Sequence, residues 1–410
     1  MNLFSEEMRR NPYPAYDQLR SAAPLLYQPS KDFWMIFDYE NVKRALADHE
    51  TFSSAIPAPP WFIFFDPPRH TKLRALINRA FTPAVIASLE PRIRGLARML
   101  VDQTIERGAM DLAMDFSVPL PMMVIAEMLG IPVADRARLS GWADNLLTLS
   151  HDLLGGQAAI NAVAEYSAAT AEMSEYLKGL IEDCRKAPRD DLLTRLDAAE
   201  VGGERLGHAE ILGFFQLLLI GGTETTTNLI NNAILCFIEH PEQIARLRER
   251  MELLPSAIEE VLRYRSPLQW MPRKIRREVQ MHGQTIPAGK TVLAVIGSAN
   301  CDPKIFPNAG KFDIARDPNP HIAFGHGIHF CLGAPLARLE ARVALAELLE
   351  RVKDFRLASD APWEPRKPLQ VLGPSRLPIR FEPGKRLAGN GESAAMGSRA
   401  VVAACPPCGS

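Results

Sequence analysis

Cysteine is scarce in this chain of 410 residues, and long apolar runs are missing. The six cysteines are Cys184, Cys236, Cys301, Cys331, Cys405 and Cys408. They are too few and too scattered for a disulfide scaffold, so a reducing compartment is the simpler reading. The apolar run from Ile211 to Ile220 is about half the ~20 residues of a membrane span and contains Gln216. Because the first residues also lack the apolar core of a signal peptide, we predict a cytoplasmic protein with no membrane anchor.

An excess of charge of one sign is also absent. Lys and Arg total 47 and Asp and Glu total 48, a net charge of −1. This balance argues against bulk binding of nucleic acid, which needs a basic excess, and against a largely disordered chain. No Gly-x-Gly-x-x-Gly follows a predicted strand, so no nicotinamide or flavin domain is apparent. The apolar share of 47% is sufficient for a sizeable core.

Helical patterns dominate the sequence. They predict a short helix at Tyr13–Ala22, mostly helix from about residue 70 to 265 with a turn at Gly202-Gly203, and a last helix from about Pro335 to Val352. The stripe Ile86, Leu89, Ile93, Leu96 and Leu100 is typical of one helix face.

Two short segments suit strands, at 33–37 and 292–296, and prolines forbid long helices between about 266 and 320. No linker divides the body. We therefore predict one mainly α domain with a small β portion over residues 1–384 and a mobile tail at 385–410.

One glycine-rich stretch contains the most informative cysteine. It reads Phe324-Gly325-His326-Gly327-Ile328-His329-Phe330-Cys331-Leu332-Gly333. Most single cysteines are small buried apolar residues, but here glycines allow a tight loop that can approach a flat ligand closely. A helix is predicted to start just after Cys331. The free N–H groups and positive dipole at a helix start favour a thiolate, which is a strong axial ligand for haem iron.

This stretch resembles the haem-binding signature of the cytochrome P450 family, Phe-Gly-x-Gly-x-His-x-Cys-x-Gly, at all six specified positions. A chance match in a chain of this length is on the order of 10⁻⁶. The resemblance covers Asn11 to about Phe381. It implies the P450 fold, with haem b (iron protoporphyrin IX) between distal and proximal helices and Cys331 as the iron ligand. Phe324 and Gly333 are then haem-binding residues.

A second stretch, Gly221-Gly222-Thr223-Glu224-Thr225-Thr226, combines poor helix formers in the middle of a predicted helix. The bland alternative is a helix-packing site with a solvated glutamate. The stretch resembles the oxygen-activation motif of P450s. That resemblance makes Gly221 a cofactor-binding residue, and makes Glu224 and Thr225 the catalytic pair that guides protons during dioxygen activation.

Cationic side chains are needed for the two haem propionates. His70 and Arg74 lie four residues apart and share a helix face, which alone would suit a solvated basic surface. By the same resemblance, His70, Arg74, Arg273 and His329 hold the propionates.

A glutamate and an arginine three residues apart usually form a weak surface contact on a helix. Here Glu260 and Arg263 resemble the P450 Glu-x-x-Arg helix. The resemblance joins them with Arg316 in a structural network without a catalytic role.

The resemblance implies a monooxygenase that inserts one atom of dioxygen into a hydrophobic small molecule by hydroxylation or epoxidation. Electrons come singly from a separate ferredoxin and its reductase, so NAD(P)H acts only indirectly. Arg338 and Arg342 are a hypothetical docking patch for an acidic partner, and we expect a monomer. The alternatives are a haem-thiolate peroxygenase or isomerase, and a sensor or carrier without turnover. Neither of these needs the acid–alcohol pair.

The substrate is less evident. The interval between Ser54 and Asp66 is short for the segment that covers the distal pocket in this family, so we expect no full helix there. Its aromatic residues, Trp61, Phe62, Phe64 and Phe65, are candidates to narrow an apolar pocket.

Overall fold

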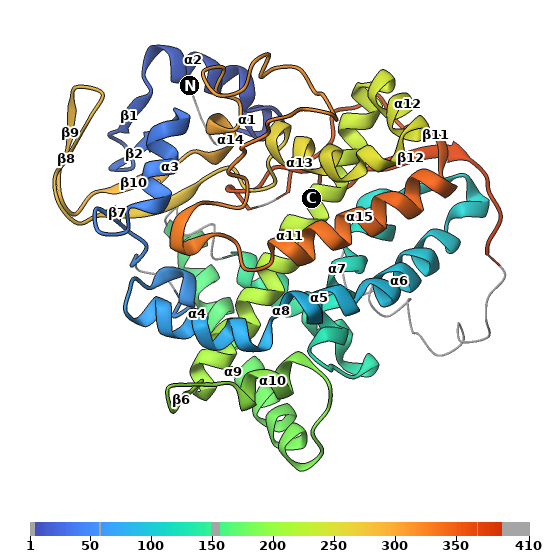
Figure 1. Cartoon of the computed structure of the whole chain (residues 1–410), viewed down its shortest axis with the longest axis horizontal. Coiled ribbons are helices and arrows are strands. Elements are labelled where there is room, and N and C mark those ends of the chain that lie inside the picture. The colour runs from blue at the N-terminus through green and yellow to red at the C-terminus, as the bar shows by residue number, and fades with distance from the viewer. Residues whose placement is uncertain (1–4, 57–58, 149–155, 367, 388–410) are drawn as a thin grey trace. The chain divides into compact units, whose positions relative to one another are not determined.

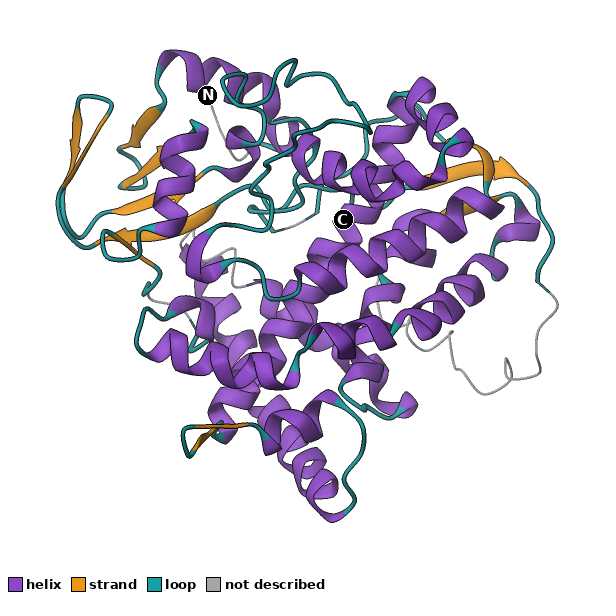
Figure 2. Ribbon diagram, in the orientation of Figure 1, coloured by secondary structure: helices purple, strands orange, loops and turns teal. Residues whose placement is uncertain are grey.

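Helices make up most of the protein and short strands a small portion (Figures 1 and 2), as the sequence predicts. The computed structural model describes residues 5–56, 59–148, 156–366 and 368–387. The chain forms two compact units, each assembled from three stretches. Unit 1 comprises Met1–Pro68, Asn228–Arg342 and Pro362–Ser375, and unit 2 comprises Arg69–Thr227, Val343–Ala361 and Arg376–Ser410.

Unit 1 contains the larger sheet. Its strands are β1 (Leu25–Gln28), β2 (Phe33–Ile36), β3 (Phe52–Ser53), β7 (Met271–Ile275), β8 (Val279–Met281), β9 (Gln284–Ile286) and β10 (Thr291–Ala294). Five of them form a sheet in the order β1-β2-β10-β7-β3, and β8 and β9 form a separate hairpin. Only the β10–β2 pair of the five-stranded sheet is parallel. Its helices are α1 (Glu6–Arg10), α2 (Tyr13–Ala22), α3 (Tyr39–Ala47), α12 (Pro241–Glu249), α13 (Leu254–Tyr264) and α14 (Ile296–Ala299).

The core of unit 1 lies between this sheet and α3, which Figure 1 shows beside β2 and β10. The Asp38 side chain caps α3 by accepting the N–H of Asn41. Val42 and Ala45 on this helix are fully buried in the cluster that contains Val292 of β10. Residues 33–36 are buried on both faces of β2, which is why the run reads as continuously apolar in the sequence.

A buried charge network in unit 1 joins α13 to the segment that follows α14. Glu260 and Arg263 are both fully buried, and Arg263 donates two hydrogen bonds of 2.8 Å to the Glu260 carboxylate. Arg316 Nε lies 3.1 and 3.0 Å from the same two oxygens. The remaining Arg263 donors reach the carbonyls of Asn300 and Ala309 at 3.1 and 3.0 Å. The predicted structural network is confirmed: both arginines bind the single Glu260 carboxylate, and further Arg263 donors are satisfied by backbone carbonyls.

Unit 2 is almost entirely helical. Its helices are α4 (Arg69–Ala80), α5 (Pro83–Ser88), α6 (Glu90–Asp102), α7 (Pro119–Met128), α8 (Arg136–Thr148), α9 (Gly156–Lys186) and α10 (Leu192–Ala198). Its strands are β4 (Ala109–Asp111), β5 (Glu200–Val201), β6 (Glu204–Arg205), β11 (Lys353–Leu357) and β12 (Pro378–Glu382). Strands β11, β12 and β4 form a three-stranded sheet in that order.

One prediction for unit 2 needs correction. The apolar stripe from Ile86 to Leu100 belongs to two helices, because α5 ends at Ser88 and α6 starts at Glu90 with Pro91 in its first turn. Ile86 of α5 and Ile93, Leu96 and Leu100 of α6 are buried, so the apolar spacing continues across the break. The predicted turn at Gly202-Gly203 is confirmed. It forms the tip of the β5–β6 hairpin, where both glycines have positive φ.

Two long helices contribute residues to both units. They are α11 (His208–Glu239), which contains the Gly221–Thr226 stretch, and α15 (Ala334–Arg351), which starts three residues after Cys331. None of the described helices is both long enough and apolar enough to cross a membrane. Cys405, Cys408 and most of the predicted tail lie outside the described residues, and the domain boundary at 384 stays a prediction.

Replacing Glu260 with alanine should leave Arg263 as an unpaired charge in the interior. We expect the variant to lose about 3–5 kcal/mol of stability, the usual cost of breaking a buried ion pair. Urea unfolding measures the loss. Glu182→Ala is the matched control, because Glu182 is also three residues before an arginine but lies exposed on α9. Equal losses for the two variants would contradict the structural role.

Candidate functional site

The Cys331 loop lies in unit 1 and ends at the first turn of α15. A 3₁₀ turn at Gly327–His329 precedes the cysteine, and the Cys331 N–H donates to the Phe324 carbonyl at 2.9 Å. Gly327 has a φ of +74°, and a Cβ there would lie 2.8 Å from the Ala47 Cα of α3. This position therefore needs glycine for both its conformation and its close packing.

Among the described cysteines, Cys331 differs in exposure. Cys184, Cys236 and Cys301 are buried, whereas Cys331 is exposed. Burial raises the pKa of the Cys236 thiol to about 12 and that of Cys301 to about 11, which makes both poor ligands and nucleophiles. The structure thus leaves one described cysteine accessible, at the start of a helix of 18 residues.

Arg273 on β7 is a buried cation. Only 3% of its surface is exposed, and burial lowers its pKa to about 10, against the smaller opposing effect of the Asp66 carboxylate. Within the described residues, its recorded hydrogen bond goes to the Pro272 carbonyl at 2.8 Å, which is a neutral acceptor. A buried arginine of this kind suits an anionic ligand, because a carboxylate would compensate its desolvation. His329, in the 3₁₀ turn before Cys331, is half-buried in the same unit.

In unit 2, α4 and α11 carry the other predicted site residues. His70 in the first turn of α4 is 2% exposed, and Arg74 one turn later is half-buried. On α11, Glu224 is 3% exposed and Thr225 is half-buried.

The glycine and threonine stretch of α11 has specific local contacts. Thr225 Oγ1 donates to the Gly221 carbonyl at 2.6 Å, within the helix ladder. A Cβ on Gly222 would lie 2.4 Å from Ile125 Cδ1 of α7, whereas one on Gly221 would meet no described atom within 4 Å. Gly222 therefore serves helix packing, and Gly221 faces open space that a ligand can occupy.

Sequence reasoning missed Asp66, which fixes the aromatic segment at residues 59–66 to β3. Its carboxylate accepts hydrogen bonds from the Ser53 hydroxyl and, at 3.0 Å, from the Ser54 N–H. Trp61 and Phe64 stack with ring centroids 5.8 Å apart around a 3₁₀ turn at Phe62–Phe64. The expectation of no full helix is confirmed for the described residues of this segment. No periodic signal in the sequence links Asp66 to serines 12 and 13 residues away.

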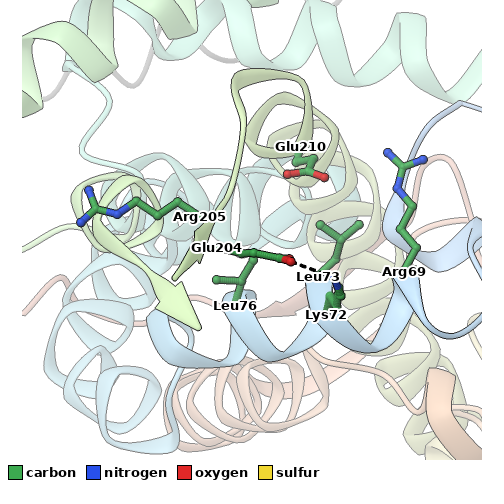
Figure 3. A pocket seen from close by; sticks show the side chains of 7 residues that line it. All are labelled: Arg69, Lys72, Leu73, Leu76, Glu204, Arg205 and Glu210. Atoms are coloured by element: carbon green, nitrogen blue, oxygen red, sulfur yellow. Dashed lines mark hydrogen bonds and ion pairs between the residues drawn. The ribbon is translucent and has the colours of Figure 1, made fainter. Parts of the chain in front are cut away.

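Unit 2 contains a cavity lined mostly by charged side chains. Its volume is about 340 Å³, and it is lined by Arg69, Lys72, Leu73, Leu76, Glu204, Arg205 and Glu210 (Figure 3). Lys72 of α4 and Glu204 of β6 form an ion pair of 2.8 Å across it, and both leucines are almost fully buried. Its paired charges do not suit a hydrophobic molecule.

Each unit, taken by itself, supplies residues that suit contact with a haem. Unit 1 supplies an accessible thiol at a helix start and a buried arginine that suits a carboxylate. Unit 2 supplies a buried histidine one helical turn from an arginine, and a glycine that faces open space. That these residues act on one haem stays a prediction.

Gly327→Ala should weaken the Cys331 loop. The substitution forces a left-handed backbone on a residue with a Cβ, at about 1–2 kcal/mol, and adds the clash with Ala47. We expect a lower unfolding midpoint and less haem per chain, measured by thermal unfolding and by absorbance. Gly283→Ala is the control, because φ is +72° there but no described atom lies within 4 Å of the added Cβ. If both variants lost the same stability, the packing argument would fail.

The chain is similar to known proteins over most of its length. The sequence model of the family described as Cytochrome P450 matches residues 157–377. The chain is 41% identical over 359 residues to the putative cytochrome P450 YjiB of Bacillus subtilis, which covers 86% of this chain and 90% of that protein. It also superposes on CYP109E1 from Bacillus megaterium in complex with testosterone, with a TM-score of 0.84 and 39% identity over 91% of this chain and 99% of the other. The structure of CYP109E1 with corticosterone gives the same TM-score and the same identity, over 92% of this chain and 99% of the other. The chain therefore belongs to the cytochrome P450 family and is a haem-dependent monooxygenase that acts on small molecules.

Proposed function

We propose that Cys331 ligates the haem iron and that Arg273, His329, His70 and Arg74 hold the propionates. The observation that carries this proposal is the exposed thiol of Cys331 at the start of α15, beside a loop that only glycine can form. The buried Arg273 adds independent support, because its desolvation needs an anionic partner. When bound, the haem supplies the reductive activation of dioxygen that places one oxygen atom in the substrate and the other in water.

Glu224 and Thr225 are the proposed proton-delivery pair. Thr225 Oγ1 holds its proton in a hydrogen bond to the Gly221 carbonyl, one helical turn earlier, so the hydroxyl stays fixed on the α11 surface. Glu224 is the adjacent residue and is almost fully buried, which shields its carboxyl from bulk water. We infer that Glu224 resupplies protons and that Thr225 positions them, whereas a peroxygenase or carrier has no need of this pair.

The substrate we propose is a hydrophobic small molecule. The segment at 59–66 supports this class, since it carries a stacked tryptophan and phenylalanine and a nearly buried Phe62. The relative CYP109E1 has been solved with testosterone and with corticosterone. Testosterone is therefore a reasonable first compound to test here.

A ferredoxin-type electron donor remains the proposed partner. The docking patch of Arg338 and Arg342 stays a proposal. Arg338 donates two hydrogen bonds to Glu259 at 2.7 and 2.8 Å, and 38% of its side chain is exposed. Arg342 is half-buried on the same helix, and Phe330 beside Cys331 is 41% exposed. We propose a docking surface that includes Arg342 and Phe330. The monomeric state and the cytoplasmic location stay predictions from the sequence.

Glu224→Gln should lower product formation from testosterone or another accepted substrate by about 100-fold, within the range for loss of a proton-transfer group. Thr225→Ala should instead sustain NAD(P)H consumption while less product forms. Turnover under ¹⁸O₂ with a ferredoxin and its reductase measures both quantities, and the wild type should place one ¹⁸O atom in each product molecule. Glu210→Gln, also on α11, is the control. The proposal would be contradicted if the wild-type product carried no ¹⁸O. It would also be contradicted if both site variants formed as much product per NAD(P)H consumed as the wild type.

Arg342→Glu should slow reduction by ferredoxin, because it reverses one charge on the proposed docking surface. Stopped-flow reduction at low salt should show a rate several-fold below wild type, and the difference should shrink as salt screens the charges. Lys353→Glu makes the same charge change at an exposed position on β11. A rate equal to that of this control would remove Arg342 from the docking surface.

A further inference from the structure

Arg338 is anchored at the start of α15, seven residues after Cys331. Its Nε and Nη2 atoms bind the two Glu259 oxygens in a fork of 2.7 and 2.8 Å. Its guanidinium also lies over the ring of Phe324, 4.5 Å from the ring centre. A forked ion pair and a cation–π contact together fix the position of this side chain.

Glu259 is held on its other side by His321. The His321 side chain is 4% exposed, and its Nε2 lies 2.9 Å from Glu259 Oε2. His321 Nδ1 accepts the N–H of Ala323 at 3.3 Å, so Nε2 carries the hydrogen and donates to the carboxylate. Burial opposes ionisation of Glu259, but the hydrogen bonds from Arg338 and His321 outweigh it and lower its pKa to about 2. The carboxylate is therefore charged throughout the physiological range.

These side chains meet the haem-ligand loop through Phe324. The His321 ring lies 6.3 Å from the Phe324 ring, and the Phe330 ring lies 6.4 Å from it on the loop itself. The Phe324 carbonyl accepts the Cys331 N–H. A shift of Phe324 would thus move the hydrogen bond that positions the cysteine.

The guanidinium of Arg338 is held over the ring of Phe324, the residue whose carbonyl accepts the Cys331 N–H, so its positive charge lies beside the haem-ligand loop. Hydrogen bonding to Glu259 is the main cause of the raised pKa of Arg338, and electrostatic attraction to Cys331 adds to it. A fixed positive charge near a sulfur ligand stabilises electron density there and favours the reduced haem.

We propose that Glu259 is a positioning residue of the haem-ligand loop. With His321 it fixes Arg338 against Phe324, and Arg338 in turn holds the loop and sets the haem reduction potential. The inference rests on the proposed function, because it takes Cys331 as the iron ligand. No contact of Glu259 with substrate or haem is needed.

The test compares Glu259→Gln, Arg338→Gln and Arg338→Lys in the haem-loaded protein. Glu259→Gln should release haem to apomyoglobin about tenfold faster than wild type, the factor that 1.4 kcal/mol is worth at 25 °C. It should also speed hydrogen exchange of the Cys331 N–H.

Arg338→Gln should make the reduction potential more negative. Arg338→Lys keeps the charge but not the fork, so it should retain the potential while releasing haem faster. If Arg338→Gln does not fold, Arg338→Met, which also removes the charge, takes its place.

Arg92→Gln is the matched control, because Arg92 forms the same kind of fork with Glu127 in unit 2, at 2.5 and 2.6 Å. It should leave the potential and the haem release unchanged. Wild-type potential in Arg338→Gln, or wild-type haem release and exchange in Glu259→Gln, would overturn the inference. If the wild type itself showed no thiolate-ligated iron, the proposed function would fail first. If the wild type had thiolate-ligated iron and the variants kept its haem release and reduction potential, only the positioning role of Glu259 would fail.

Discussion

A cysteine serves a haem only if its sulfur is accessible while the backbone around it is held still, and the chemistry of this protein depends on that constraint. The Cys331 N–H is fixed by the Phe324 carbonyl, and Gly327 packs against the backbone of α3. The sulfur itself is left exposed at the start of α15. Backbone contacts therefore hold the loop in place around Cys331.

Buried charge is the second organising feature, and it takes two forms. Arg263 and Arg316 both bind the Glu260 carboxylate inside the protein, as is usual where ionic groups serve the fold. Arg273 differs, since it is equally buried but its recorded hydrogen bond goes to a neutral carbonyl. The fold therefore maintains a desolvated cation whose electrostatic cost the Asp66 carboxylate offsets only in part. This contrast is the reason to propose Arg273 as a haem-binding residue and Arg263 as a structural one.

Local sequence patterns predicted what local forces determine. The helix at Tyr13–Ala22 and the helix after Cys331 follow from apolar spacing and from proline in the first turn, and both are present. The prediction missed the break at Leu89, because Ile86 of α5 and Ile93 of α6 are both buried and the apolar spacing continues across it. The Glu260 network was accessible only through resemblance to a family. Glu259 and Arg338 lie 79 residues apart in the chain, and no spacing rule links an exposed-looking arginine to such a partner. Only the tertiary fold shows that Arg338 is hydrogen-bonded to Glu259.

The most direct test of the account is the difference spectrum of the dithionite-reduced protein with carbon monoxide, for the wild type and for Cys331→Ser. A band near 450 nm, which gives the family its name, in the wild type and its loss in the variant are the expected results. Cys301→Ser, which alters a buried cysteine, should keep the band. A wild-type band near 420 nm in folded, haem-loaded protein, or a 450 nm band that survives in Cys331→Ser, would contradict the assignment of Cys331 as the iron ligand.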